Sequence, residues 1–319
     1  MDTASASQAS PTYPVDIITA IVSQVNDPKT LLSLCLTNHF VGHEGRRWLY
    51  RDLDAGPYKP EFHLKRLSSL LSNPSLPPLV QSFTLVRMTR PAEHTEDTLY
   101  QLIEEEPDYT ERMNLVEQLL SALLEKALPR MVNLRELEYC SRSPGGTTGL
   151  KLLLAPGEST TFHLQMLRWG NSWDDHFIDF IKTQKYLKAL ALGSGLCPSD
   201  AIINHRIPQD ICDGLAAISG DQRVVEAILP FALGVKSVVL DIGKLKDGKG
   251  VFGSKVDLKV TGPLAKAMPQ LTRLTLHNYT TRISIATFGA EALRGLRVLA
   301  VDSILPEYAS VSLRSHSVY

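Results

Sequence analysis

The sequence predicts an α/β protein in which three N-terminal helices precede an irregular solenoid of strands and helices. Two observations support this prediction. Residues 12–54 contain three short amphipathic patterns separated by helix-stop and helix-start signals. Beyond them, the pattern apolar-x-x-apolar-x-apolar recurs along most of the 319-residue chain. Two apolar residues two positions apart fit one face of a short strand, and a repeated strand–helix unit builds a curved solenoid.

Local signals place the first three helices. Pro14 can open the first helix because its missing N–H costs nothing in a first turn, and Ile17 and Ile21 then recur at helical spacing. Asp27 and Pro28 are the expected N-cap and first residue of the second helix. A third amphipathic segment runs from about residue 38 to residue 49. So short a segment rarely builds a sufficient core, so part of its apolar surface should meet another surface.

The ordered set of residues in 12–54 resembles the F-box family. The matching positions are Pro14, Asp16, Ile17, Ile21, Val25, Asp27, Pro28, Leu31, Leu32, Phe40, Trp48, Leu49, Tyr50 and Leu53. The chain departs from the family pattern at Tyr13, where Leu is usual, and at Thr37, where Val is common. The alternative is an ordinary helical subdomain packed on the rest of the chain.

This resemblance implies a substrate receptor of an SCF-type cullin–RING ubiquitin ligase. In that family the F-box docks on a Skp-type adaptor, which joins the cullin scaffold, and the receptor itself is not an enzyme and has no cofactor. The implied adaptor-binding residues are Pro14, Ile17, Ile18, Ile21, Val25, Leu31, Leu32, Trp48 and Leu49. Some of them must pack the helices together instead, and the sequence does not separate the two sets.

The repeat that follows has apolar central residues at intervals of 20 to 54 positions: Phe83, Leu137, Leu167, Leu190, Val238, Leu274 and Leu299, with a weaker instance at Ile218. Most intervals lie in or near the leucine-rich-repeat range of 20–29 residues. Helices are expected at 62–71, 114–128, 176–182, 224–229 and 264–268. This part resembles fungal F-box proteins with irregular leucine-rich repeats. The Asn or Cys expected after each strand is absent, and a compact parallel α/β domain is the alternative.

Residues that flank the central position of each strand should point away from the solenoid core. The centre of this stripe is small and apolar, with charges to one side, and it is a candidate site for a peptide or helix of an unknown protein substrate. Loops covering the stripe are the alternative. The candidate substrate-binding residues are Glu136, Glu138, Met166, Arg168, Ala189, Ala191, Val239, Arg273 and Thr275.

Composition is that of an ordinary globular protein, with 44% hydrophobic and 21% charged residues. A net charge of −1 provides no field for nucleic acid or anionic lipid, so neither is an expected partner. Four dispersed cysteines indicate reduced thiols and a cytoplasmic or nuclear location. Residues 1–11 are expected to be a disordered lead-in, and 93–111 a solvated acidic insertion. The C-terminal end predicts either a further helix or a domain that continues beyond Tyr319.

One segment resembles a nucleotide-binding loop. Gly243–Gly250 matches G-x-x-x-x-G-K-[ST] except at Gly250, where a hydroxyl would hold Mg²⁺. The segment that follows alternates like a strand, which favours a hairpin loop over a phosphate site. A nucleotide-binding enzyme therefore remains the less favoured alternative, with loss of binding expected on Lys249→Ala. The other alternative is a repeat scaffold that acts without a ligase.

Overall fold

The chain divides into two units, Met1–Leu53 and Asp54–Tyr319. The computed structural model describes residues 14–53, 60–86, 107–140, 161–170, 175–193, 209–242, 262–278 and 294–303. Several expectations fall outside these residues: the lead-in 1–11, most of the acidic insertion, the loop Gly243–Gly250 and the C-terminal end.

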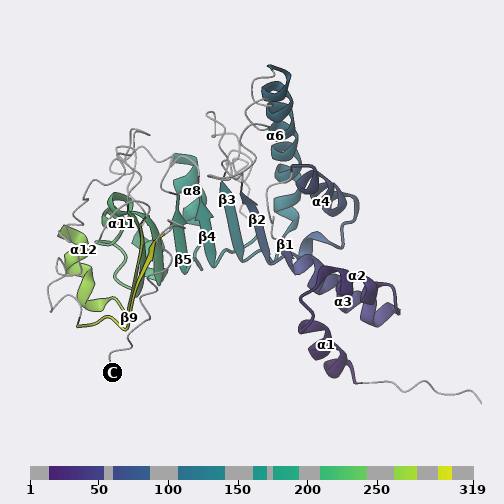
Figure 1. The fold of residues 1–319 in the computed structure, drawn as a ribbon, viewed down its shortest axis with the longest axis horizontal. Coiled ribbons are helices and arrows are strands. Elements are labelled where there is room, and N and C mark those ends of the chain that lie inside the picture. The colour runs from purple at the N-terminus through teal and green to yellow at the C-terminus, as the bar shows by residue number, and fades with distance from the viewer. Residues whose placement is uncertain are drawn as a thin grey trace, which may run out of the picture. The chain divides into compact units, whose positions relative to one another are not determined.

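The first unit consists of three helices and a short strand: α1 (Val15–Ser23), α2 (Pro28–Cys35), α3 (His39–Arg51) and β1 (Asp52–Leu53) (Figure 1). The expected N-cap is confirmed, since the Asp27 carboxylate accepts a hydrogen bond from the Thr30 N–H at 2.9 Å. The Thr30 hydroxyl donates a second hydrogen bond to the same carboxylate at 2.6 Å. The pKa of Asp27 is lowered mainly by the bond from the hydroxyl and to a smaller extent by the bond from the N–H. Pro14 is the N-cap residue of α1, just before the first helical turn.

Helix α3 packs against both other helices of the first unit. Gly42 and Gly45 are buried on α3, and a Cβ atom at either position would lie within 3.0 Å of Cys35 on α2. Two glycines three residues apart therefore let α2 and α3 approach closely. Few large apolar side chains of this unit are buried: among its described residues they are Val22, Leu31 and Leu53.

The second unit is built around parallel strands that pair in chain order. The strands are β2 (Ser82–Val86), β3 (Glu136–Cys140), β4 (Met166–Trp169), β5 (Ala189–Leu192), β6 (Ala217–Asp221), β7 (Ser237–Ile242), β8 (Arg273–Asn278) and β9 (Val298–Ser303). The α-helices are α4 (Pro60–Ser72), α6 (Pro107–Ala127), α8 (Asp175–Thr183), α10 (Gln209–Gly214), α11 (Gln222–Ile228) and α12 (Gly262–Ala267). Short 3-10 turns η1 (Pro77–Leu79), η2 (Leu128–Arg130) and η3 (Met268–Gln270) precede β2, β3 and β8.

The strands are in register at the positions the repeat pattern predicted. Phe83, Leu137, Leu167, Leu190, Ile218, Val238, Leu274 and Leu299 form one continuous row across the sheet. From Phe83 to Leu274 this row is buried. The residues on either side of it point to the opposite face. The instance at Ile218 proves to be a full strand, β6, which the sequence signal understated.

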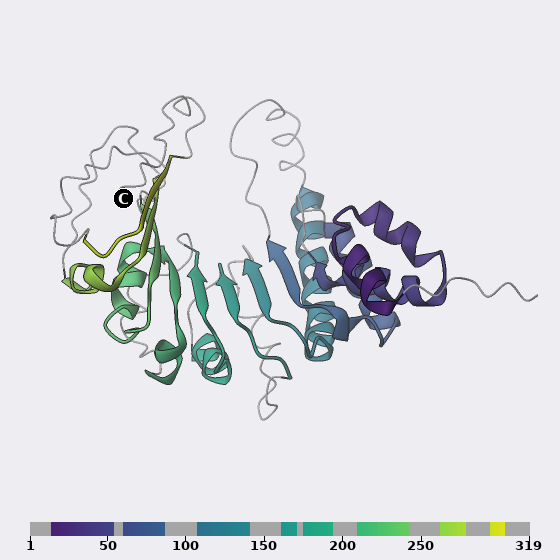
Figure 2. The same ribbon diagram turned by 90° about the horizontal axis from the view of Figure 1, so that it is seen from below.

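The helices between the strands lie on one face of the curved sheet (Figure 2). The five expected helices are confirmed within a few residues, except that α6 begins at Pro107 rather than at residue 114. Helix α10 was not expected. On the helix-covered face, Trp169 stacks on Tyr139 at 5.2 Å and on Phe177 of α8 at 5.1 Å, which joins sheet and helix through aromatic contacts. This alternation of parallel strands and helices is consistent with a leucine-rich-repeat-like solenoid.

Candidate functional site

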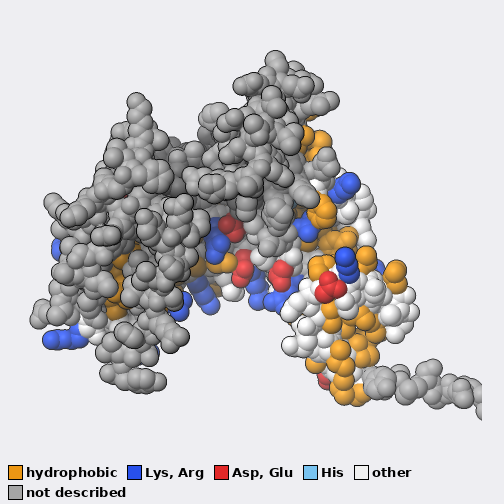
Figure 3. Space-filling view, viewed as in Figure 1, with side chains coloured by type: hydrophobic (Ala, Val, Ile, Leu, Met, Phe, Trp, Pro, Cys, Tyr) orange, Lys and Arg blue, Asp and Glu red, His pale blue; other side chains and the backbone are white. Residues whose placement is uncertain are grey.

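The first unit exposes an apolar surface, formed by Val15, Ile17 and Ile21 of α1 with Leu32 and Leu36 at α2. These side chains retain between 49% and 82% of their accessible surface. Figure 3 shows hydrophobic side chains gathered over these helices. We call these five residues the N-terminal apolar surface. Five exposed large apolar side chains on so small a unit indicate an interaction site.

The structure separates the nine predicted adaptor-binding residues by burial. Pro14, Ile17, Ile21 and Leu32 are exposed, whereas Leu31 is only 5% exposed and packs within the unit. The other four are half-buried: Ile18, Val25, Trp48 and Leu49. Trp48 also carries the guanidinium group of Arg51 over its ring, 4.6 Å from the centroid. The residues that sequence reasoning missed are Val15 and Leu36, which flank the predicted set on the same helices.

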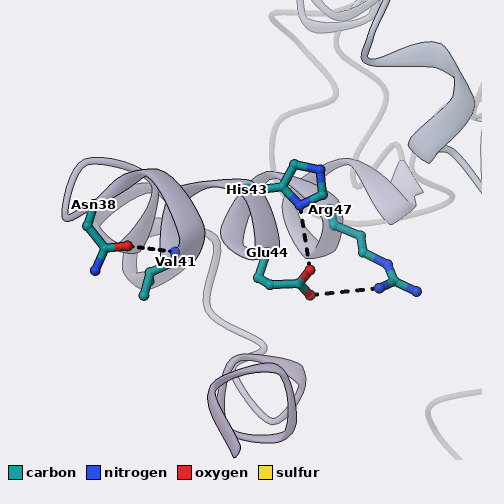
Figure 4. A network of polar contacts seen from close by, with 5 residues as sticks. All are labelled: Asn38, Val41, His43, Glu44 and Arg47. Carbon is teal, nitrogen blue, oxygen red and sulfur yellow. Dashed lines mark hydrogen bonds and ion pairs between the residues drawn. The ribbon is translucent and has the colours of Figure 1, made fainter. Parts of the chain in front are cut away.

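Helix α3 carries a polar network that is structural in character (Figure 4). The Asn38 side chain accepts a hydrogen bond from the Val41 N–H at 2.8 Å and so caps the helix. The buried Glu44 carboxylate lies 3.5 Å from His43 Nδ1 and 3.8 Å from an Arg47 nitrogen. All these residues belong to α3 or to its N-cap, so these contacts stabilise α3 and do not form a site between elements.

A second feature is a groove of about 550 Å³ on the face of the sheet opposite the helices. Six of the nine predicted substrate-binding residues line it, whereas Glu136, Arg273 and Thr275 do not. The six are Glu138, Met166, Arg168, Ala189, Ala191 and Val239. Sequence reasoning missed Ala217 and Ser219 because it gave β6 little weight. It also missed Asp241 and His277, which lie two residues further along β7 and β8 than the flanking residues Val239 and Thr275. We call this feature the sheet groove.

The sheet groove has charged ends and a floor of small residues. At one end Arg168 lies 3.3 Å from the Glu138 carboxylate, and at the other His277 Nδ1 lies 3.5 Å from Asp241. Strands β4 and β7 are three strand spacings apart, or about 14 Å. Between them the floor consists of Ala189, Ala191, Ala217 and Ser219. Such a groove can hold an extended or helical segment.

Signs of chemistry are few in the part of the chain that the structure describes. No three His, Cys, Asp or Glu side chains there are placed to hold a metal ion. Burial raises the pKa of the Cys35 thiol, which keeps it protonated and poorly nucleophilic. Among the same residues, none of the helices combines the length and the hydropathy needed to cross a membrane.

Comparison with known proteins adds no family assignment. No protein-family model matches the chain, and no curated protein matches it either.

Proposed function

We propose that this protein is a substrate receptor of an SCF-type cullin–RING ubiquitin ligase, with an F-box at its N-terminus and leucine-rich-repeat-like units after it. The observation that carries the proposal is the N-terminal apolar surface. It lies on the helices where the F-box resemblance implies contacts with a Skp-type adaptor, and Ile17, Ile21 and Leu32 belong to both sets.

The energetics of exposure support the same interpretation. Burying one large aliphatic side chain stabilises a complex by about 1.5–3 kcal/mol. A surface that leaves Ile21 61% and Leu36 82% exposed forgoes this gain unless another surface covers it. A specific interface of about 800 Å² per partner is large enough to cover all five side chains.

The second unit then supplies the substrate contact. We assign this role to the sheet groove, because it is the face of the strands that the helices do not cover. The receptor does no chemistry in this scheme. It raises the effective concentration of substrate lysines near the ubiquitin-charged enzyme that the cullin scaffold recruits.

Co-expression with a Skp-type adaptor, followed by size-exclusion chromatography, tests the proposal. Wild type should form a stable one-to-one complex, and an Ile21→Asp/Leu32→Asp variant should not. A matched control places the same two charges on exposed leucines of α6, as Leu115→Asp/Leu119→Asp, and should bind as wild type does. If the wild-type chain elutes without the adaptor, the F-box assignment is refuted.

A ligase-independent scaffold would bind the adaptor equally well, so a second measurement separates the two functions. The purified adaptor complex is mixed with the cullin–RING scaffold, and ubiquitin transfer to bound proteins is followed. Assembly and transfer are expected for a receptor. If the adaptor complex does not bind the cullin–RING scaffold, this protein acts without a ligase.

A further inference from the structure

A line of cationic side chains runs along the edge of the sheet where the strands begin. At each step two consecutive N–H groups donate to one carbonyl oxygen of the preceding strand, as Lys188 and Ala189 do to Gln165 at 2.8 and 3.0 Å. The same pattern repeats along the edge and defines a row. Its members are Gln81, Arg135, Gln165, Lys188, Ala216, Lys236, Thr272 and Arg297.

Cations occupy every second position of this row. Arg135, Lys188, Lys236 and Arg297 precede β3, β5, β7 and β9, and uncharged residues precede β4, β6 and β8. All four side chains are exposed, and none is paired with a carboxylate of the described residues. Figure 3 shows Lys and Arg side chains along this edge. We call these four residues the basic row.

Exposed apolar side chains lie beside the basic row. A tight turn leads into each strand, closed by a hydrogen bond such as that from the Val235 N–H to the Ala232 carbonyl at 3.2 Å. Val132, Tyr186 and Leu233 are residues of three of these turns, and they are 46%, 62% and 68% exposed. Each of these apolar residues precedes a member of the basic row by two or three positions, so cationic and apolar side chains lie together along one edge.

The spacing of the basic row fits a helix. Two strand spacings separate neighbouring cations by about 9.5 Å. Residues seven apart in an α-helix lie on the same face and about 10.5 Å apart. In an extended chain, three residues span about 10 Å, but successive such positions point to opposite sides. An acidic residue on every second turn of a helix therefore meets successive cations.

The edge is less suited to nucleic acid. Glu136 and Asp213 are exposed there as well, and a continuous polyanion would lie against both carboxylates. A protein segment can place neutral or basic residues opposite them. Apolar side chains of a protein segment can also pack on the exposed side chains of Tyr186 and Leu233.

We propose that this edge is a docking surface for an amphipathic helix of a protein partner that carries acidic residues seven positions apart beside apolar ones. The basic row forms the ionic contacts, and Val132, Tyr186 and Leu233 form the apolar ones. The inference does not depend on the ligase assignment, because it uses a different surface from both the N-terminal apolar surface and the sheet groove.

Fluorescence anisotropy with a synthetic peptide tests the inference on the full chain. The probe is a helical peptide of about 24 residues with glutamates seven apart and leucines beside them. A second peptide of the same composition distributes its glutamates around the helix. The first should bind wild type about tenfold or more tightly than the second, and added salt should weaken the binding.

Two variants with equal loss of charge sharpen the test. The basic-row variant replaces four cations with glutamine, and it should lose about tenfold or more in affinity for the first peptide. The matched control does the same at four exposed lysines elsewhere and should bind normally. The substitutions are Arg135→Gln, Lys188→Gln, Lys236→Gln and Arg297→Gln in the first, and Lys29→Gln, Lys65→Gln, Lys126→Gln and Lys266→Gln in the second.

Three results would overturn the inference: equal binding of the two peptides, equal loss in the two variants, or tighter binding of a single-stranded oligonucleotide of the same charge. A further variant exchanges Arg for Lys and Lys for Arg at the four positions, which keeps the charge and so separates loss of charge from loss of folding. That variant should retain binding, and its failure to do so while folded would also count against the proposal.

Discussion

Gly42 of α3 lies so close to Cys35 of α2 that a Cβ atom at Gly42 would fall 2.9 Å from the Cys35 carbonyl oxygen. A backbone oxygen cannot rotate away as a side chain does, so any side chain at this position separates the two helices. The positions of Leu31 and Leu32 on α2 depend on this contact. The exposed apolar surface of the first unit is therefore coupled to a glycine that does not belong to it.

Substitution of Gly42 is expected to destabilise the first unit without changing its surface. Gly42→Val should lower the free energy of unfolding by about 1–3 kcal/mol, as overpacking does, and should weaken adaptor binding indirectly. Thermal unfolding followed by far-ultraviolet circular dichroism measures the effect. His39→Val is the matched control because His39 is an exposed residue of the same helix outside the polar network. Equal melting temperatures for the two variants would show that the helices are not in close contact.

Truncation of Leu31 should destabilise the chain much more than truncation of Ile21, although both are aliphatic residues of the predicted adaptor set. Leu31→Ala removes a buried side chain and should cost about 2–5 kcal/mol of stability. Ile21→Ala alters an exposed one and should stay within about 0.5 kcal/mol. Urea unfolding of the isolated chain measures both. A large loss of stability with Ile21→Ala would mean that this residue packs within the chain.

Gln184 is fully buried and should be essential to the second unit. Its side-chain carbonyl accepts a hydrogen bond from the Leu164 N–H at 2.8 Å, and its amide donates to the Thr183 hydroxyl at 2.8 Å. Gln184→Leu leaves a buried N–H unsatisfied and should cost about 1–3 kcal/mol in urea unfolding. Gln165→Leu, at an exposed position, should have little effect. A neutral outcome for Gln184→Leu would contradict the hydrogen-bonded geometry.

His63 on α4 should make stability depend on pH. Burial, and then the nearby charge of Arg66, lowers the pKa of His63 below its ordinary value of 6.5. The unfolded chain therefore binds a proton near pH 6.5 while the folded chain does not, so stability falls as pH drops from there toward the lower folded pKa. Above this range the residue has no effect. His63→Gln should flatten the dependence in chemical unfolding between about pH 7 and pH 5, and an unchanged slope would reject this origin.

Elements with a strong local pattern were predictable from the sequence. The strands around Leu137, Leu167 and Leu274 stand out because alternation places every second residue in the core. Strand β6 gave a weak signal because Gly220 stands where the last apolar residue of the pattern is expected, and its place in the sheet comes from pairing with β5 and β7. Helix α10 is only six residues long, too short for a periodic pattern to establish.

The candidate sites were predictable only in part. Periodicity identified which residues share a face, and six of them do line the sheet groove. It did not indicate that Leu31 is buried while Leu32 is exposed, because both lie on the apolar side of one helix and only α3 distinguishes them. The basic row went unnoticed because its members are about 50 to 60 residues apart in the chain.

The sequence by itself determined the two kinds of repeating pattern, the helix caps and the faces of the strands, because these depend on neighbours a few residues away. Only the tertiary structure decided which apolar residues remain exposed, where the charged pairs of the sheet groove lie and that Arg135, Lys188, Lys236 and Arg297 form one row. Those features depend on strand register and helix packing, which join residues that are distant in the chain. Each such contact needs a partner whose position no local pattern encodes.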